Sequence, residues 1–336
     1  MTSSPDIRVL VTGGSGFIGS NFIKYLLISP EVQERVAVAN LDDLTYAADG
    51  KNLEHMGISK HSRYQFFKGD ICDRFFVNGA IWLIEPDYIF HFAAESHVDR
   101  SLQDDAPFKR TNVIGTGTLL AALAGSTRFV HISTDEVYGS TTGPSFKETD
   151  ETNPGNPYAR TKEHAEVLAR HYAQVHGKDV IITRSANNYG PYQFPEKFLP
   201  KSITEILNGR NIPLMWSPEN PGLNVRDWLH VEDNCRAIWH LALNGNSGET
   251  YNIPGENERT NIEVARMILA HYGFQEDRIT RSKHREKHDF RYSIDGTKLK
   301  QTGFQYTHLD LEKGIDELCT WYSTNSNWWR PLKKQE

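Results

Sequence analysis

The feature that most constrains the fold is a glycine-rich loop between a strand-like run and a helix-like run near the N-terminus. Residues 7–12 read Ile-Arg-Val-Leu-Val-Thr, typical of a buried parallel strand, and lead directly into Gly13-Gly-Ser-Gly16-Phe-Ile-Gly19. Glycines three residues apart allow a tight turn and let the backbone approach a pyrophosphate at the start of the next helix, expected at 20–27. The loop predicts a dinucleotide-binding unit, with a purely structural turn as the alternative.

An acidic residue follows the next strand-like run. Residues 36–41 read Val-Ala-Val-Ala-Asn-Leu and precede Asp42. An acid about twenty residues beyond such a loop can accept the ribose 2′-hydroxyl of a dinucleotide. Asp43 adds a second negative charge, and the two acids together would repel the 2′-phosphate of NADP. We therefore predict NAD as the cofactor. A solvated turn acid is the alternative for Asp42, and it accounts less well for the spacing.

The first part of the chain alternates strand-like and helix-like segments. Further strand-like runs stand at 64–68, 88–92, 129–133 and 180–184, and helical segments are expected at 112–124 and 158–175. This alternation predicts an α/β fold with a Rossmann-type doubly wound parallel sheet. We expect residues 1–190 to form the NAD-binding domain and to carry the catalytic residues. Prolines interrupt the pattern later, so residues 191–336 are expected to form mainly a smaller substrate-binding α/β lobe, with the chain crossing between the lobes.

Composition narrows the class of protein. The 336 residues carry a formal net charge of −6, which disfavours a broad nucleic-acid surface. No apolar stretch approaches the ~20 residues of a membrane span, and little sequence precedes the first strand, so neither a membrane segment nor a signal peptide is expected. Cys72, Cys235 and Cys319 are odd in number and far apart, which favours free thiols in a reducing cytoplasm. His97 and His288 show no metal-ligand spacing, and no metal is predicted.

Tyr158 and Lys162 stand four residues apart within an expected helix. Residues at that spacing share one helix face, and a lysine beside a tyrosine favours the phenolate and lowers a pKa that starts near 10. Such a tyrosine can take the proton of an alcohol as hydride leaves the same carbon. An ordinary surface pair is the alternative for an isolated match.

Asp135 and Glu136 are adjacent carboxyls at the end of the 129–133 run. Eliminating water requires an acid and a base, so this pair indicates an oxidation coupled to a dehydration. Burial of Asp135 beside Glu136 should raise its pKa and keep it protonated. A solvated turn is the alternative, and the nearby tyrosine and lysine count against it.

These motifs resemble those of the extended short-chain dehydrogenase/reductases and, more narrowly, those of the dTDP-glucose 4,6-dehydratases. The narrower resemblance lies in Ala93-Ala-Glu-Ser-His-Val-Asp-Arg-Ser101, Ser133-Thr-Asp-Glu-Val-Tyr-Gly139, Asn187-Asn-Tyr-Gly-Pro-Tyr-Gln-Phe-Pro-Glu-Lys197 and Lys287-His-Asp-Phe-Arg-Tyr292. It extends from the first strand to Trp328-Trp329-Arg-Pro-Leu332 and so covers nearly the whole chain.

The resemblance implies a mechanism. Tyr158, assisted by Lys162, would take the 4-hydroxyl proton of the sugar while hydride passes from C4 to NAD. Thr134 would hydrogen-bond the C4 oxygen, Glu136 would remove the C5 proton, and Asp135 would protonate the departing C6 hydroxyl. The hydride would return to C6, so NAD is regenerated in each turnover and the product is a nucleotide 4-keto-6-deoxyhexose.

The resemblance also implies the binding residues. The expected cofactor contacts are Gly13, Gly16, Phe17, Ile18, Gly19, Asp42, Asp43, Leu44, Thr45, Asp70, Ile71, Ala93, Ala94, Ser96, Thr111, Tyr158, Lys162 and Asn188. The expected substrate contacts are Ser96, Thr134, Asn187, Lys197, Phe198, Pro213, Met215, Arg226, Asn261, Arg285 and His288. Arg226 and Arg285 are the expected pyrophosphate partners, because a guanidinium group can bind two phosphate oxygens at once. A homodimer is expected through the helical segments 112–124 and 158–175.

Several departures from the family pattern fall near the expected nucleotide pocket. Met215 replaces an aromatic residue, Phe198 replaces a leucine, and the segment 213–226 carries an insertion. These changes leave UDP-glucose or another nucleotide sugar open beside dTDP-glucose. Two other functions also stay open: a nucleotide-sugar epimerase, which needs no Asp-Glu pair, and a non-catalytic NAD-binding protein, which need not keep Tyr158 or Lys162.

Overall fold

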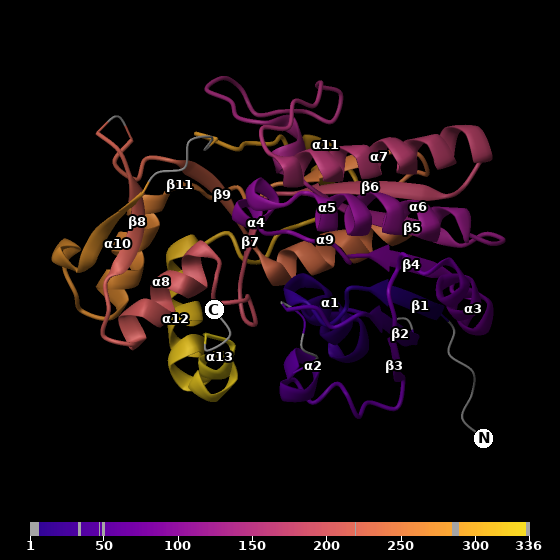
Figure 1. Ribbon diagram of the computed structural model, residues 1–336, viewed down its shortest axis with the longest axis horizontal. Helices are drawn as coiled ribbons and strands as arrows, with labels where there is room; N and C mark the ends of the chain where they lie inside the picture. The colour runs from indigo at the N-terminus through magenta and orange to yellow at the C-terminus, as the bar shows by residue number, and fades with distance from the viewer. Residues whose placement is uncertain are drawn as a thin grey trace.

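The structure is a computed structural model that describes residues 7–32, 35–46, 48, 51–218, 220–283 and 289–333. The chain forms a larger lobe built on a parallel sheet and a smaller, mainly helical lobe beside it (Figure 1). Two of the expected substrate residues, Arg285 and His288, lie outside the described residues.

The strands are β1 (Ile7–Thr12), β2 (Val36–Asp42), β3 (Tyr64–Lys68), β4 (Tyr88–His91), β5 (Arg128–Thr134), β6 (Val180–Ser185), β7 (Asn187–Tyr189), β8 (Ile212–Trp216), β9 (Val225–His230), β10 (Thr250–Ile253), β11 (Glu258–Thr260) and β12 (Ile279–Lys283). The α-helices are α1 (Phe17–Ile28), α2 (Lys51–His55), α3 (Arg74–Ile84), α4 (Val98–Gln103), α5 (Ala106–Phe108), α6 (Thr116–Ala121), α7 (Pro157–His176), α8 (Phe198–Leu207), α9 (Val231–Asn244), α10 (Asn261–His271), α11 (Thr297–Gln301), α12 (Leu311–Thr324) and α13 (Ser326–Leu332). A π-helix, η1 (Lys109–Gly115), and two 3-10 helices, η2 (Asp135–Tyr138) and η3 (Glu276–Arg278), complete the elements.

The large sheet has the strand order β10-β6-β5-β4-β1-β2-β3, and every neighbouring pair is parallel. The strand order reverses between β1 and β4, which is the point where ligands bind in open α/β sheets. This topology confirms the predicted Rossmann-type doubly wound sheet.

Alternating side chains of the buried strands pack on opposite faces of this sheet. In β1, Val9 and Val11 join a core cluster with residues of α1 and α9, whereas Leu10 joins a second cluster with residues of α3 and α6. Both faces of the sheet are therefore apolar, as expected for a parallel sheet covered by helices. The covered sheet holds the ends of its strands in fixed positions, which the site requires.

Most of the expected elements are present, with three differences. The first helix begins at Phe17 directly after the glycine loop, earlier than residue 20. The helix expected at 112–124 is instead the π-helix η1 followed by the short α6. The seventh strand, β10, comes from residues 250–253, so the chain returns to the large sheet after it has entered the smaller lobe.

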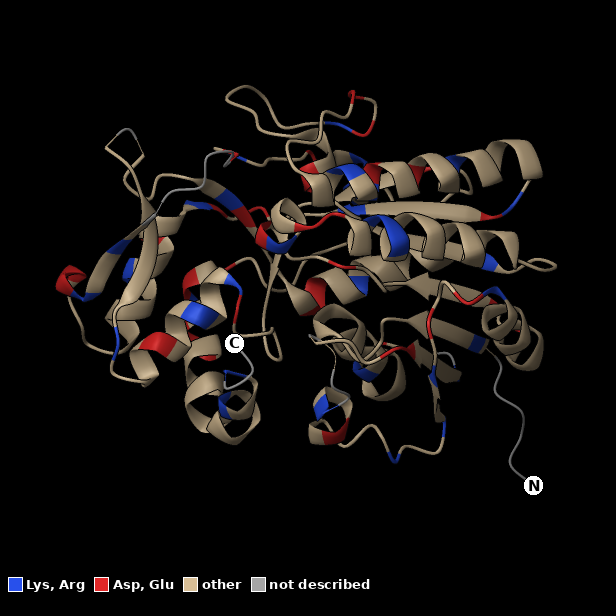
Figure 2. Ribbon diagram, viewed as in Figure 1, with Lys and Arg blue, Asp and Glu red and all other residues tan. Residues whose placement is uncertain are grey.

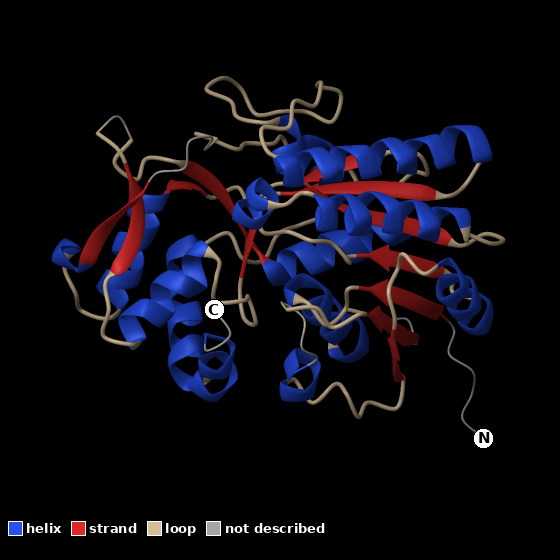
Figure 3. Cartoon of the chain, viewed as in Figure 1, coloured by secondary structure: helices blue, strands red, loops and turns tan. Residues whose placement is uncertain are grey.

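The smaller lobe is built mainly of helices (Figure 3). Its own apolar core lies between α8, α10, α12 and α13. A three-stranded sheet of order β11-β9-β7 and the parallel pair β12-β8 complete the lobe. Because β7 follows β6 after a single residue, the small three-stranded sheet begins directly beside the end of the large one.

Charges of both signs are interspersed over both lobes (Figure 2). Cys72, Cys235 and Cys319 are free thiols. Among the helices in the described ranges, we find none with the length and apolar character needed to cross a membrane.

Candidate active site

The glycine loop has the close packing that its sequence predicts. Gly13 has φ +72°, and a Cβ at this position would lie 2.5 Å from the backbone nitrogen of Ala93. A Cβ at Gly19 would lie 2.4 Å from the carbonyl oxygen of Gly13. Side chains at these two positions would therefore displace either the segment that follows β4 or the loop itself. The loop leads into the N-terminus of α1, which favours a bound anion.

Asp42 ends β2 beside this loop. Its Oδ2 accepts a hydrogen bond from the Ser15 backbone at 2.9 Å, and its Oδ1 accepts one from the Leu44 backbone at 2.8 Å. Burial raises the pKa of Asp42, although both backbone hydrogen bonds oppose the rise. Asp43 is exposed. The carboxylate of Asp42 is thus held in place by the loop, with lone pairs left for a further donor.

A cavity of about 640 Å³ lies over the ends of the central strands. Most of the expected cofactor residues line it: Gly13, Gly16, Phe17, Ile18, Gly19, Asp42, Asp43, Thr45, Asp70, Ile71, Ala93, Ala94, Ser96, Thr111, Tyr158 and Lys162. Two expected contacts are not among its lining residues. Leu44 adopts φ +57° and donates its backbone N–H to Asp42, while the side chain of Asn188 bonds to Ala186 O and to Asn234.

Tyr158 and Lys162 lie in the first turns of α7. The helix begins with Pro157 after Asn156, whose side chain accepts a hydrogen bond from the backbone of Ala159. Both Tyr158 and Lys162 line the cavity, as their spacing predicts. The Nζ of Lys162 donates to the backbone oxygen of Ile132 at 2.6 Å, and burial lowers the pKa of Lys162 to about 8.

The predicted effect of Lys162 on Tyr158 is wrong in this structure. The pKa of Tyr158 is raised rather than lowered, first by burial and then by the charges of Glu136 and Asp135. A hydrogen bond with Thr134 opposes the rise without overcoming it. The neutral phenol is therefore the resting form, and added positive charge is needed to favour the phenolate.

Asp135 and Glu136 follow β5 directly, in the first turn of η2. Asp135 is buried, with 2% of its surface exposed, and its Oδ2 has no hydrogen-bond partner among the described residues. The hydroxyl of Thr134 lies 3.2 Å from its Oδ1. Burial and the neighbouring charge of Glu136 raise the pKa of Asp135 well above its ordinary value, as predicted. The pair can therefore carry one proton, held on Asp135.

Glu136 is contacted by two residues that are not among the expected site residues. Asn156 donates from Nδ2 to Glu136 Oε2 at 3.0 Å, and the hydroxyl of Tyr292 lies 3.4 Å from the same oxygen. Tyr292 donates its proton to Asp289 at 2.6 Å, the shorter of its two contacts. Burial raises the pKa of Glu136 as well. Asp289 and Tyr292 belong to one of the strings that carry the resemblance, which was the available signal for them.

Only part of the expected substrate set reaches the cavity. Ser96 and Lys197 line it, and Lys197 Nζ donates to the backbone oxygen of Ser96 at 3.0 Å. Glu95 and Glu196 also line it and were not expected. Each glutamate is adjacent in the sequence to an expected site residue, Glu95 to Ser96 and Glu196 to Lys197. This adjacency was the sequence signal by which the two glutamates could have been predicted.

The remaining expected substrate residues that the structure describes lie outside the cavity lining. Thr134 ends β5, and the others lie in or next to the smaller lobe. Arg226 on β9 lies 4.3 Å above the Tyr292 ring and donates to the backbone oxygens of Val225 and Asp289. It lies close enough to the carboxyl pair to oppose the rise in the pKa of Glu136. The other expected residues are spread over four elements: Asn187 lies on β7, Phe198 on α8, Pro213 and Met215 on β8, and Asn261 on α10.

Comparison with known proteins places the chain in a family. Residues 10–318 match the protein family described as GDP-mannose 4,6 dehydratase. The chain belongs to this 4,6-dehydratase family. Among curated relatives, a dTDP-glucose 4,6-dehydratase from Streptomyces niveus is 43% identical over 334 residues, covering 98% of this chain and 97% of the relative.

Solved structures of other proteins agree with the family membership. The structure of the dTDP-glucose 4,6-dehydratase DesIV from Streptomyces venezuelae, with NAD and TYD bound, superposes with a TM-score of 0.91 at 42% identity, covering 97% of this chain and all of that chain. A UDP-glucose 4-epimerase from Thermotoga maritima, with UDP-glucose, gives a TM-score of 0.85 at 25% identity, covering 95% of this chain and all of that chain. This 4,6-dehydratase family member therefore has the same fold as the epimerase, but its sequence identity with the dehydratases is higher.

Proposed function

We infer that this chain is an NAD-dependent hydro-lyase that converts dTDP-glucose to dTDP-4-keto-6-deoxyglucose. The observation that carries this inference is the carboxyl pair at the end of β5, in which burial and the charge of Glu136 raise the pKa of Asp135 well above its ordinary value. An oxidation at C4 alone needs no such pair, whereas loss of water from C5 and C6 needs both an acid and a base. Full-length relatives at about 40% identity that are dTDP-glucose 4,6-dehydratases support the substrate.

The cavity fits a dinucleotide. Its volume of about 640 Å³ lies in the usual range for cofactor pockets, and its wall includes the glycine loop, the N-terminus of α1 and the carboxylate of Asp42. The loop and helix would hold the pyrophosphate, and Asp42 would accept from the adenosine ribose. When bound, NAD supplies a hydride acceptor for C4, a hydride donor for C6 and a positive charge that favours the Tyr158 phenolate.

Tyr158 and Thr134 are proposed to act at the C4 oxygen of the sugar. Thr134 lies close enough to Tyr158 to oppose the rise in the pKa of the phenol. A substrate hydroxyl placed between them can pass its proton to Tyr158 and accept from Thr134. Lys162, fixed by Ile132 O, adds positive charge on the same side of the helix. The high pKa of Tyr158 makes its phenolate a strong base once it forms.

Glu136 and Asp135 are proposed to carry the elimination. The ketone formed at C4 acidifies the C5 proton, and the carboxylate of Glu136 removes it. Asp135 then donates its proton to the C6 hydroxyl, so the C6–O bond breaks and water leaves. Glu136 returns a proton to C5 of the resulting C5–C6 double bond, and the bound cofactor would supply the hydride to C6. The proton that Tyr158 took from O4 makes up for the one that Asp135 gave to the leaving hydroxyl, so the net change is the loss of one water.

A homodimer in the cytoplasm is the proposed assembly and location. The exposed apolar residues Ile114 on η1 and Val167 on α7, 58% and 54% exposed, support pairing through these helices. The free thiols of Cys72, Cys235 and Cys319 support a reducing compartment. Light scattering tests the dimer, and a mass of one chain would contradict it.

The function is tested by incubating the purified full-length protein, without added NAD, with dTDP-glucose, UDP-glucose, CDP-glucose and GDP-mannose. Mass spectrometry should detect loss of one water from dTDP-glucose. Loss of water from another nucleotide sugar instead would identify that sugar as the substrate and would attribute the altered nucleotide selectivity to the 213–226 segment. If no substrate loses water even with NAD supplied, the dehydratase inference fails.

The E136Q variant separates a dehydratase from an epimerase on the same scaffold. The amide keeps the size and the contact with Asn156 but cannot remove a proton. Dehydration should fall by about 10²-fold or more, the usual contribution of a general base. If a sugar dehydratase activity survives intact in this variant, Glu136 is not the base.

A further inference from the structure

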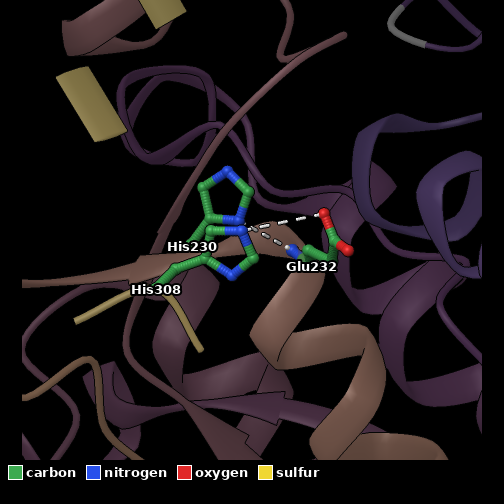
Figure 4. Close-up of side chains that lie close together, drawn as sticks. All are labelled: His230, Glu232 and His308. Atoms are coloured by element: carbon green, nitrogen blue, oxygen red, sulfur yellow. Dashed lines mark hydrogen bonds and ion pairs between the residues drawn. The ribbon is translucent and has the colours of Figure 1, made fainter. Parts of the chain in front are cut away.

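Three side chains that could bind a metal meet at the junction of the two lobes, away from the cavity. His230 ends β9, Glu232 lies in the first turn of α9, and His308 precedes α12 (Figure 4). One ligand atom from each lies within 4.8 Å of the other two. None of the three lines the cofactor cavity. The cluster is therefore separate from the chemistry proposed above.

The hydrogen bonds of His308 fix which ring nitrogen carries a proton. Thr307 donates its single hydroxyl proton to Asp233 Oδ1 at 2.7 Å, so its oxygen can only accept from His308 Nδ1, 2.9 Å away. The neutral His308 ring therefore has its proton on Nδ1 and its lone pair on Nε2. That lone pair lies 3.9 Å from the carboxylate oxygen Oε2 of Glu232.

His230 turns a ring nitrogen toward the backbone N–H of Glu232. Its Nδ1 accepts the backbone N–H of Glu232 at 3.3 Å, so this nitrogen carries no proton. The close-up shows a nitrogen of each ring facing Glu232 (Figure 4). The backbone N–H of Glu232 occupies the His230 Nδ1 lone pair, whereas the Nε2 lone pair of a neutral His308 and the Glu232 carboxylate face each other without a proton between them. Such an arrangement is stabilised by a bound cation.

We propose that His230, Glu232 and His308 form a binding site for a divalent transition metal of the zinc class. Two imidazole nitrogens and one carboxylate, with a further position open to water, are a ligand set that zinc takes. Zinc–ligand bonds of about 2.0–2.2 Å would bring the donor atoms, which now lie within 4.8 Å of one another, to separations of roughly 3.3–3.6 Å. The bound ion would join the start of α9 to the segment before α12.

Two features show how the site would adjust on binding. The rings stack with centroids 4.1 Å apart and planes 19° apart, whereas a metal lies in the plane of an imidazole, so at least one ring must turn. The Glu232 side chain is 58% exposed and can follow the ion. Asp233, buried and fixed by the backbone N–H groups of Thr307 and His308, anchors the segment that carries His308.

The test uses the full-length protein, freed of metal with EDTA and dialysed, and titrated with Co²⁺ at about pH 7.5. The wild type should bind one Co²⁺ per chain with a visible absorption band, which Zn²⁺ should abolish by displacing Co²⁺. H308A should lose the band, and E232Q should bind at least about tenfold more weakly. H271A is the matched control, because His271 pairs with Asp316 alone and should leave the titration unchanged.

Melting curves make the result independent of catalysis. Zn²⁺ should raise the Tm of the wild type and of H271A, EDTA should reverse the rise, and H308A should not respond. If H308A fails to fold, E232Q still decides, because Glu232 is at the surface. Equal Co²⁺ binding by wild type and E232Q would overturn the proposal. So would a wild-type Tm that responds to pH but not to Zn²⁺, which would assign the cluster to a protonated histidine pair.

Discussion

Replacing Asp135 by asparagine should separate the oxidation from the dehydration. The asparagine keeps the shape of the side chain and its contact with Thr134, and it removes the proton that the carboxyl would give to the departing hydroxyl. Because Asp135 is 2% exposed, water cannot readily take over as the acid. The C4 oxidation should continue, since Tyr158 and Lys162 are unchanged, and the elimination should become the slow step.

The size of the effect follows from the geometry. General acid catalysis contributes about 10²–10⁴-fold, which is roughly 3–5 kcal/mol of the barrier. The asparagine amide can still donate a hydrogen bond to the leaving oxygen, which retains on the order of 1 kcal/mol. The other carboxyl oxygen, Oδ2, has no partner among the described residues, so none of their side chains competes for its proton. The remaining roughly 2–4 kcal/mol corresponds to an expected loss of about 10²-fold, and at most about 10³-fold, in kcat for dehydration.

The assay follows reduced cofactor and C5 exchange in the same reaction. In D₂O, D135N mixed with dTDP-glucose should accumulate the absorbance of NADH and exchange the C5 hydrogen while the C6 oxygen is retained. E136Q is the matched comparison, and it should accumulate NADH without C5 exchange. Loss of water by D135N within tenfold of the wild-type rate would refute the role of Asp135, as would an equal loss of the C4 oxidation.

Two further predictions concern pH and stability. The pKa of Glu136 is raised above 4.5 and that of Asp135 well above 3.8. The rate of dehydration should therefore rise with pH above 4.5, as Glu136 ionises, and fall again at higher pH, as Asp135 loses its proton. A kcat profile already flat at pH 4.5 would contradict this. E166Q should lower the free energy of unfolding by about 3–5 kcal/mol. The fully buried carboxylate of Glu166 accepts a hydrogen bond from Arg184 Nη2 at 2.6 Å, and removing the negative charge leaves the buried guanidinium group without its counter-ion. Urea unfolding measures this, and the exposed E312Q, expected to change stability by less than about 0.5 kcal/mol, is the control.

The sequence allowed the large sheet to be predicted almost completely, because its strands are long apolar runs with helices between them. β1 and β3 have the predicted bounds. The edge strand β10 was missed because it has only four residues and pairs with β6, from which it is separated by a long stretch of chain. A short edge strand carries too little periodicity to be recognised alone. The segment of the π-helix η1 was predicted as part of an α-helix, because the residue types of a sequence do not distinguish the wider π turn from an α turn.

The cavity residues at strand ends were predictable because parallel strands bring their carboxyl ends to one edge of the sheet. Residues of the smaller lobe were harder to place, because their positions depend on how that lobe packs. Arg226 illustrates this: its type suggests a pyrophosphate partner, but no pattern in the sequence shows that its guanidinium lies over the ring of Tyr292. The metal-ligand cluster was also invisible, since His230 and His308 lie in separate segments that meet only in the folded chain.

The electrostatics of Tyr158 show why a correct motif can still give a wrong pKa. The four-residue spacing places Tyr158 and Lys162 on one face of α7, but the effect of Lys162 depends on what its ammonium group contacts. That partner is the Ile132 backbone oxygen, which no sequence motif specifies. The carboxyls that the elimination requires lie close enough to disfavour the phenolate. Keeping Asp135 protonated removes one of these two charges, so the raised pKa of Asp135 serves the oxidation as well as the dehydration.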